Sequence, residues 1–156
     1  MRYAAVLLAV RDMESSKRFY REVLGLEVAA DFGANVTLTG GIVLQTADTW
    51  ARFIRRAADE IVYQNNAAEL YFEEDRIDDF AAKLAAIPGI VYVHPLLEHP
   101  WGQRVVRFYD PDGHIIEVGE NLAMVVRRFL DGGLSVQETA ARMDMPEDDV
   151  RSCLRP

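Results

Sequence analysis

The fold predicted for this chain rests on the stretch FYDPDGHIIEV, residues 108–118. Its centre, Asp110-Pro111-Asp112-Gly113, is typical of a tight turn, because proline fixes φ and glycine permits a positive φ. The residues on either side are rich in strand formers. The sequence therefore predicts strands over 103–109 and 115–119 that are joined by a tight turn.

Working back from this turn, the second half of the chain contains three further elements. A strand is predicted over 69–73, a helix over 77–87 and another strand over 90–96. The helix has apolar residues on one face and is stopped by Pro88-Gly89. Residues 67–121 are thus expected to run strand, helix, then three strands.

The first half repeats this order of elements. A strand is predicted over 3–10, and Asp12 can cap a helix that Gly25 ends with a positive φ. Strands over 26–32, 36–39 and 42–46, a short helix over 49–58 and a polar linker around residues 64–66 follow. The repeat concerns element order and not residue identity, and it indicates two equivalent modules, near residues 1–56 and 67–121.

Residues 122–156 read as a helical C-terminal extension. Ser135 with Glu138 has capping-box spacing, and Met145-Pro146 opens a last short helix. Residues 134–154 resemble a helix-turn-helix in rhythm. The second helix begins with acidic residues at 147–149, which would repel phosphate, so packing on the body or a dimer contact is favoured over DNA reading.

The composition is that of a folded globular protein. Half of the 156 residues are hydrophobic, 27% are charged, and the formal net charge is −8. This charge disfavours nucleic acid and anionic membranes as partners. No stretch reaches the roughly 20 apolar residues needed to span a bilayer. There is also no basic leader before an apolar run, so a cytoplasmic protein is expected.

Several pieces in this order resemble the vicinal oxygen chelate superfamily, which includes glyoxalase I, fosfomycin- and bleomycin-resistance proteins and extradiol dioxygenases. They are residues 10–12 (VRD), 16–20 (SKRFY), 23–26 (VLGL) and 108–118. The resemblance covers about residues 1–121. It implies an α+β fold in which paired βαβββ modules form a curved mixed sheet around a cavity, with the helices on the convex face.

Alternation along the predicted strands indicates which side chains would face that cavity. The loop at 99–102 precedes one of these strands and could close the cavity mouth, with Trp101 stacking on a ligand. The expected ligand-binding residues are Gln45, Tyr71, His99, Trp101, Gln103, Arg107 and Tyr109, together with the carboxylates Glu69 and Glu117.

The resemblance implies that a metal, if present, would be held at the positions of Ala5, Gln45, Glu69 and Glu117. Ala5 offers no lone pair, so the first ligand of the family is missing. One interpretation is that Gln45, Glu69 and Glu117 still hold one divalent ion (Mg²⁺, Mn²⁺, Ni²⁺ or Zn²⁺). The favoured interpretation is a metal-free pocket in which Arg107 pairs with Glu117.

Two functions follow from these interpretations. The first is a lyase- or isomerase-like enzyme, or one related to dioxygenases, in which Glu117 or Glu69 is the general base and a metal or Arg107 polarises a carbonyl. The alternative is a non-catalytic protein that sequesters a drug or metabolite, which the aromatic residues Tyr71, Tyr109 and Trp101 favour. The resemblance also implies a homodimer.

Overall fold

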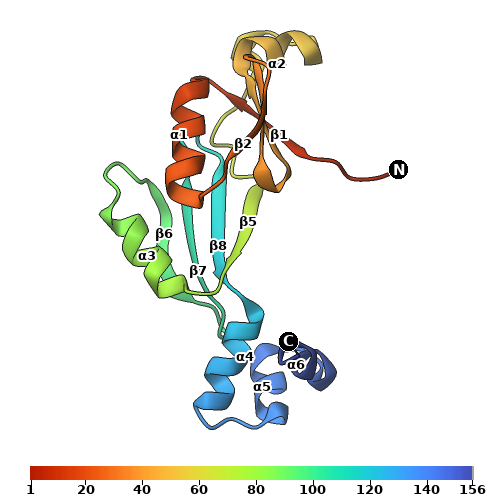
Figure 1. The fold of residues 1–156 in the computed structure, drawn as a ribbon, viewed down its shortest axis with the longest axis vertical. Helices are drawn as coiled ribbons and strands as arrows, with labels where there is room; N and C mark the ends of the chain where they lie inside the picture. Colours follow the sequence, from red (N-terminus) through yellow and green to blue (C-terminus); the bar gives the residue numbers. More distant parts are fainter. Residues whose placement is uncertain (156) are drawn as a thin grey trace. The chain divides into compact units, whose positions relative to one another are not determined.

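The protein is described by a computed structural model covering residues 1–155, and Figure 1 shows its fold. The chain divides into two compact units. Unit 1 contains Met1–Ala68 and the turn Asp110–His114, and unit 2 contains Glu69–Tyr109 and the chain from Ile115 onward.

Unit 1 contains a four-stranded mixed sheet with the strand order β1-β4-β3-β2. The first strand is parallel to the fourth, and the other neighbouring pairs are antiparallel. The parallel pair requires a crossover, which passes through helix α1. The strands are β1 (Val6–Val10), β2 (Val28–Asp31), β3 (Asn35–Leu38) and β4 (Ile42–Thr46).

Helix α1 (Met13–Leu24) begins and ends as its sequence predicts. The Asp12 side chain accepts a hydrogen bond from the backbone N–H of Ser15, and Gly25 closes the helix with φ 70°. The buried face includes Tyr20 and Val23 and packs against β4. This burial of one helix face against the sheet forms the core of unit 1 together with Val10, Val36, Leu38, Ile42 and Leu44.

Several boundaries in unit 1 differ from the prediction, those of β2 and β3 by one or two residues. The first strand begins at Val6 and not at residue 3. Helix α2 covers Ala47–Ile54, earlier than the predicted 49–58, because Arg55 takes up a left-handed conformation and ends the helix. Short 3₁₀ turns occupy Thr39–Gly41 (η1) and Ala58–Glu60 (η2).

The turn Asp110–His114 is held in unit 1 by its acidic side chains. Asp110 Oδ2 accepts a hydrogen bond from the buried Tyr20 hydroxyl at 2.9 Å and lies 2.8 Å from Nδ1 of His114. Asp112 accepts the backbone N–H of Arg11 at 3.0 Å and the hydroxyl of Ser16 at 3.3 Å. The turn thus bonds to α1 and to the residue before its N-cap. His114 takes part in this structure through its contact with Asp110.

Unit 2 repeats the strand, helix and three-strand order, which confirms the predicted pair of βαβββ modules. Its sheet has the order β5-β8-β7-β6, again with one parallel pair, β5 and β8. The elements are β5 (Glu69–Glu74), α3 (Ile77–Ala86), β6 (Tyr92–Glu98), β7 (Arg104–Tyr109) and β8 (Ile115–Glu120).

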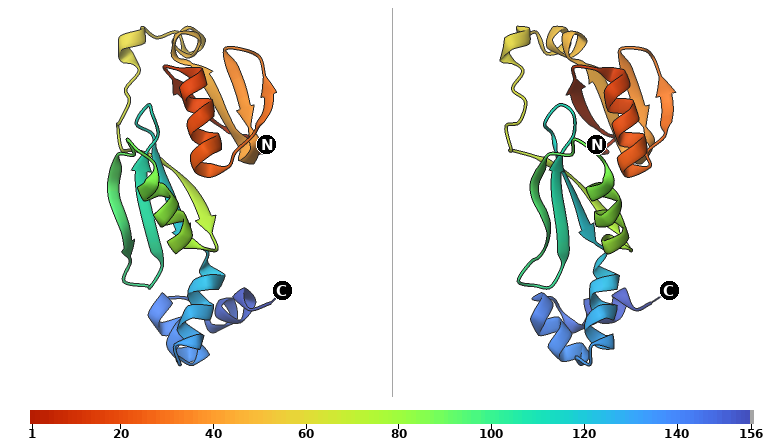
Figure 2. Two further views of the ribbon diagram at one scale, coloured as in Figure 1. Left: turned by 60° about the vertical axis from the view of Figure 1, so that its left-hand side comes forward. Right: turned by 90° about the vertical axis from the view of Figure 1, so that its left-hand side faces the viewer.

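Helix α3 covers one face of the second sheet (Figure 2) and contacts β7 and β8. Its Phe80 lies against Phe108 with ring centroids 6.3 Å apart, and Leu84 is buried. Ile116 and Val118 of β8 are buried with Phe108. Since side chains alternate along a strand, the intervening residues of β7 and β8 point to the face opposite α3.

The C-terminal extension consists of three helices that belong to unit 2 (Figure 1). These are α4 (Leu122–Asp131), α5 (Val136–Met143) and α6 (Glu147–Cys153), and the predicted capping box at Ser135 is present. They share a small hydrophobic core made of Val125, Val126, Ala140, Met143 and Val150. Among residues 1–155, no helix has the length and apolar character needed to cross a membrane.

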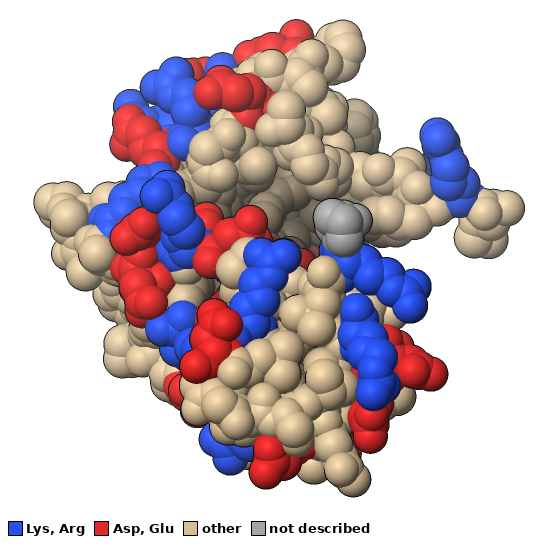
Figure 3. Space-filling model, turned by 60° about the horizontal axis from the view of Figure 1, so that its bottom comes forward, with Lys and Arg blue, Asp and Glu red and all other residues tan. Residues whose placement is uncertain are grey.

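On the face seen in Figure 3, Lys and Arg side chains are interspersed with Asp and Glu side chains. In the extension, Arg151 pairs with Glu147 and Asp148 of its own helix, and Arg142 pairs with Glu98 at the end of β6. No continuous basic field is visible on this face, as a phosphate-binding surface would require.

Candidate ligand-binding face

Arg107 is the centre of a charged cluster on the face of the second sheet opposite α3. Its Nε donates to Oε2 of Glu69 at 2.9 Å, and its Nη2 forms an ion pair with Oε2 of Glu117. Its Nη1 donates to Nε2 of His94 at 3.1 Å, while Nδ1 of His94 lies 2.9 Å from its neighbouring Pro95 carbonyl oxygen. One guanidinium group therefore contacts two carboxylates and one imidazole.

The strand register produces this cluster. Arg107 of β7 lies opposite Glu117 of β8, and Glu117 lies opposite Tyr71 of β5. Directly opposed side chains on one face are about 5 Å apart at Cβ, within reach of a long arginine side chain. Glu117 is 6% exposed, whereas Glu69 is exposed, so the cluster reaches from the interior of unit 2 to its surface.

Gln103 connects the loop at residues 99–103 to the same face. Its Nε2 donates to the Glu120 carbonyl oxygen at 2.9 Å and to the Tyr71 hydroxyl at 3.1 Å. Its Oε1 accepts from the indole N–H of Trp101 at 3.3 Å. The buried amide of Gln103 thus bonds two aromatic side chains and one backbone carbonyl. Gln103 lies just before β7, although the sequence predicted it to be within this strand.

Gly119 makes this arrangement possible, and the sequence analysis did not single it out. A Cβ atom at Gly119 would lie 3.0 Å from Nε2 of Gln103 and 3.1 Å from the Tyr71 ring. A glycine inside a strand often marks a place where another group approaches the backbone closely. That general signal was available in the sequence, but the identity of the approaching side chains was not.

His99 and Trp101 stack on each other, with ring centroids 4.2 Å apart and planes 13° apart. The prediction had Trp101 stacking on a ligand, and in the structure His99 already covers one side of the indole. Trp101 remains 40% exposed. The pKa of His99 is lowered by burial and by the positive charge of Arg107 and the proximity of His94, which favours the neutral imidazole at pH 7.

Two other predicted site residues are Tyr109 and Gln45. Tyr109 is the last residue of β7, opposite Ile115, and is partly buried. Gln45 belongs to unit 1, where its Oε1 accepts from the side-chain amide of Asn35 at 2.6 Å and its Nε2 donates to the Thr49 hydroxyl. Both ends of the Gln45 amide are therefore used within unit 1.

The residues at the expected metal positions do not fit a divalent ion. Glu69 and Glu117 share the Arg107 guanidinium, whose charge opposes a cation at the same carboxylates. The amide of Gln45 is engaged elsewhere, and Ala5 has no donor atom. Across residues 1–155, no three His, Cys, Asp or Glu side chains are grouped so that they could hold a metal.

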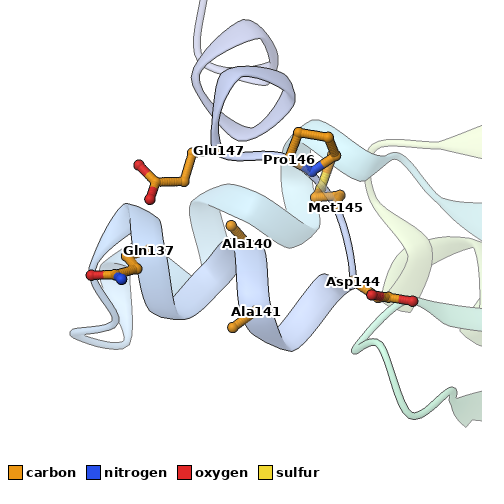
Figure 4. Close-up of a pocket in the computed structure, with 7 residues that line it drawn as sticks. All are labelled: Gln137, Ala140, Ala141, Asp144, Met145, Pro146 and Glu147. Atoms are coloured by element: carbon orange, nitrogen blue, oxygen red, sulfur yellow. The ribbon is translucent and has the colours of Figure 1, made fainter.

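A hollow of about 400 Å³ lies in the C-terminal extension (Figure 4). It is formed by α5, the following turn and the start of α6, and none of the predicted site residues lines it. Its lining residues are Gln137, Ala140, Ala141, Asp144, Met145, Pro146 and Glu147.

Comparisons with known proteins agree with this architecture. A family model for the glyoxalase-like domain matches residues 3–123. A crystal structure of a protein of unknown function from Agrobacterium tumefaciens is 40% identical, with a TM-score of 0.70 over 78% of this chain and 94% of that one. No protein of curated function matches the sequence significantly.

Two further solved structures from this superfamily are similar to the chain. A lactoylglutathione lyase from Agrobacterium tumefaciens is 25% identical, with a TM-score of 0.58 over 78% of this chain and 94% of that one. A glyoxalase/bleomycin resistance protein/dioxygenase from Nocardioides is 21% identical, with a TM-score of 0.64 over 77% and 83% of the two chains. The latter shows the shared fold alone. With its family match and its two βαβββ modules, this chain belongs to the glyoxalase-like domain family of the vicinal oxygen chelate superfamily.

Proposed function

We propose that this protein binds a small organic molecule on the face of the second sheet opposite α3, and that it does so without a metal ion. The observation that carries the proposal is Arg107, which lies between Glu69 and Glu117. A guanidinium group in this place satisfies both carboxylates, as a metal would, and leaves polar and aromatic groups around it for a ligand.

The side chains around the cluster indicate the chemistry of the ligand. Tyr71 is 49% exposed, and Glu69 and Glu73 of the same strand are also exposed. Tyr71, together with Trp101, offers aromatic surface for stacking. The carboxylates outnumber the guanidinium, so a planar ligand that carries positive charge or several hydrogen-bond donors is favoured.

The same geometry weakens the case for Glu117 as a general base. The residue is 6% exposed and its carboxylate is already engaged by the Arg107 guanidinium, so it is poorly placed to reach a substrate proton. A second candidate function, a lyase or isomerase, is favoured by the neutral imidazole of His99 beside this cluster. In that case His99, and not Glu69 or Glu117, would accept the proton.

Thermal unfolding of the chelator-treated protein tests the proposal. We expect no stabilisation by Mg²⁺, Mn²⁺, Ni²⁺ or Zn²⁺, and saturable stabilisation by a planar cationic probe, either proflavine or metal-free bleomycin. Tyr71→Ala should weaken probe binding about tenfold, equivalent to roughly 1.4 kcal/mol. The matched control is Tyr92→Ala, because Tyr92 lies opposite Phe108 on the α3 side of the sheet.

Stoichiometric metal in the purified protein, or equal losses in Tyr71→Ala and Tyr92→Ala, would overturn the proposal. Turnover of a hemithioacetal substrate that is abolished by His99→Asn would instead support the lyase candidate. Binding of the probe without turnover supports sequestration.

We also propose that the protein is a cytoplasmic homodimer. The edge strand β6 presents exposed apolar side chains, including Val93 and Leu97, and unit 1 exposes Phe32 and Phe53. Exposed apolar groups along a sheet edge favour association with a second copy of the chain. Light scattering should give twice the monomer mass, and a monomer at micromolar concentration would contradict this.

The cytoplasmic location is supported by the cysteine content. The one cysteine, Cys153, agrees with a reducing compartment, and cell fractionation tests this location.

A further inference from the structure

Helix α4 of the C-terminal extension contacts the loop between β6 and β7, at the lower end of the second sheet in Figures 1 and 2. Nη2 of Arg128 donates to the backbone carbonyl oxygen of Gly102 at 2.5 Å. This carbonyl lies between Trp101 and Gln103 in the sequence. The helix therefore holds the backbone of the loop that carries two side chains of the candidate site.

Phe129 adds an apolar contact at the same point. A Cβ atom built at Gly102 would lie 2.1 Å from the Phe129 ring, so the ring packs directly on the glycine backbone. Gly102 also has φ +90°, which favours glycine. The loop conformation thus depends on a residue without a side chain, and the extension fills the space that this leaves.

Glu120 links the helix to the site by a second route. Its carboxylate is almost fully buried and accepts hydrogen bonds from both Arg104 and Arg128. Its backbone carbonyl oxygen accepts the hydrogen bond from the Gln103 amide. One residue at the end of β8 therefore contacts the extension through its side chain and the candidate site through its backbone.

From these contacts we propose that α4 is a positioning element for the ligand-binding face, and that Arg128 is its positioning residue. Arg128 fixes the 99–103 loop so that the Trp101 indole and the Gln103 amide stay at the face opposite α3. The part that concerns ligand affinity rests on the proposed function, whereas the part that concerns the loop does not. The family match ends at residue 123, so Arg128 and Phe129 lie outside the shared domain and the residues that they contact lie inside it.

Fluorescence of Trp101 tests the loop directly. In a Trp50→Phe background, Trp101 is the one remaining tryptophan. We expect Arg128→Gln to raise the acrylamide quenching constant of Trp101 about twofold or more, because the loop loses its backbone anchor. The matched control is Arg127→Gln, which removes the same charge from an exposed position on the same helix. It should leave quenching unchanged.

A second pair of variants separates positioning from general destabilisation. Arg128→Lys keeps a positive charge near Glu120, so the variant should fold. A lysine ammonium group lacks the planar set of donors by which the guanidinium contacts the Gly102 carbonyl and the Glu120 carboxylate together, so the quenching constant of Trp101 should still rise. Arg142→Gln removes another contact between the extension and Glu98 but none to Gly102, and should not change quenching. If Arg128→Gln fails to fold, Arg128→Lys decides the question.

Proflavine affinity, measured by calorimetry, provides the second readout. We expect Arg128→Lys to weaken proflavine binding about fivefold, with an unchanged stoichiometry. Unchanged quenching and affinity in a folded Arg128→Lys protein would overturn the inference and leave the proposed function intact. Raised quenching with no proflavine binding in the parent protein would support the positioning of the loop and refute the proposed function for this probe.

Discussion

Tyr20 donates its hydroxyl hydrogen to Oδ2 of Asp110, 90 positions further along the chain, at 2.9 Å. Both residues belong to the motifs by which the sequence resembles its superfamily, one on α1 and one in the DPDG turn. The same carboxylate oxygen of Asp110 lies 2.8 Å from Nδ1 of the His114 imidazole. The two motifs are therefore adjacent parts of one hydrogen-bonded cluster.

Tyr20→Phe should destabilise the protein by about 1.5–3 kcal/mol, because it removes a buried hydrogen bond to an ionised acceptor. Burial, together with the charge of Asp110, raises the pKa of Tyr20, so the hydroxyl keeps its proton at all working pH values. Urea unfolding measures the effect. The control Tyr3→Phe changes an exposed tyrosine and should leave the midpoint where it is. Equal midpoints for the two variants would argue against a role of this bond in stability.

Arg107→Gln should turn the candidate site into a cation site. Without the guanidinium, Glu69 and Glu117 have no positive charge between them, and paired carboxylates attract divalent ions. We expect Mn²⁺ to raise the melting temperature of this variant by several degrees and to leave the parent protein unaffected. Arg76→Gln, at an exposed arginine that pairs with Asp79, is the control. An Arg107→Gln protein indifferent to Mn²⁺ would show that the carboxylates are not close enough to cooperate.

The His99–Trp101 stack should respond to acid. Burial, Arg107 and His94 hold the pKa of His99 below its usual 6.5, so the imidazole is protonated only below that pH. A protonated imidazole quenches an indole stacked on it, so Trp101 fluorescence in a Trp50→Phe protein should fall with a midpoint below 6.5. The lowered pKa also means that protonating His99 destabilises the fold, so stability is at its full value above the unfolded pKa and is lost as pH falls through the folded pKa. His99→Asn should abolish the transition; a midpoint above 6.5 would contradict the assignment.

Glu120→Gln should be among the more damaging polar substitutions. It leaves Arg104 and Arg128 without their buried carboxylate, and we expect the free energy of unfolding to fall by about 2–4 kcal/mol. This is at the low end for buried ion pairs, because both guanidinium groups retain some contact with solvent. Chemical denaturation at pH 7 measures this loss. The control is Glu147→Gln, which removes a half-exposed carboxylate that pairs with Arg151 of the same helix.

The pH dependence of the same variant gives an independent check. Burial raises the pKa of Glu120, but the hydrogen bonds from Arg104 and Arg128 outweigh it and lower the pKa below the usual 4.5. The stabilisation is therefore present above the unfolded pKa and is lost as pH falls through the folded value. The difference between parent and Glu120→Gln should shrink on acidification below the usual carboxyl pKa of 4.5. A constant difference would show that Glu120 acts through packing.

Local signals were sufficient for the element order and for the shared face of Arg107 and Glu117. The capping residues Asp12 and Ser135 and the stop at Gly25 are where the sequence predicts them. Alternation along β7 and β8 places Arg107 and Glu117 on one face, because a strand has a strict period of two. These features depend on residues within one turn of helix or on one strand.

The remaining features depend on contacts between distant segments. The stacking of His99 on Trp101, the contact of Arg128 with Gly102 and the engagement of Gln45 by Asn35 and Thr49 follow from the packing of loops and helices. No periodicity encodes such contacts. Arg107 likewise contacts both Glu69 and Glu117 because of the register between paired strands, whereas the sequence indicated a pair with Glu117 alone.

The placement of the DPDG turn has a consequence for recombination within the family. The turn is encoded between two strands of the second module, yet its hydrogen bonds are made to residues of the first. A chimera that joins one member's first module to another's second keeps these bonds only if Ser16 and Tyr20 meet aspartates at both turn positions. An exchange of modules between family members is therefore expected to cost stability unless the residues on both sides of these hydrogen bonds are exchanged together.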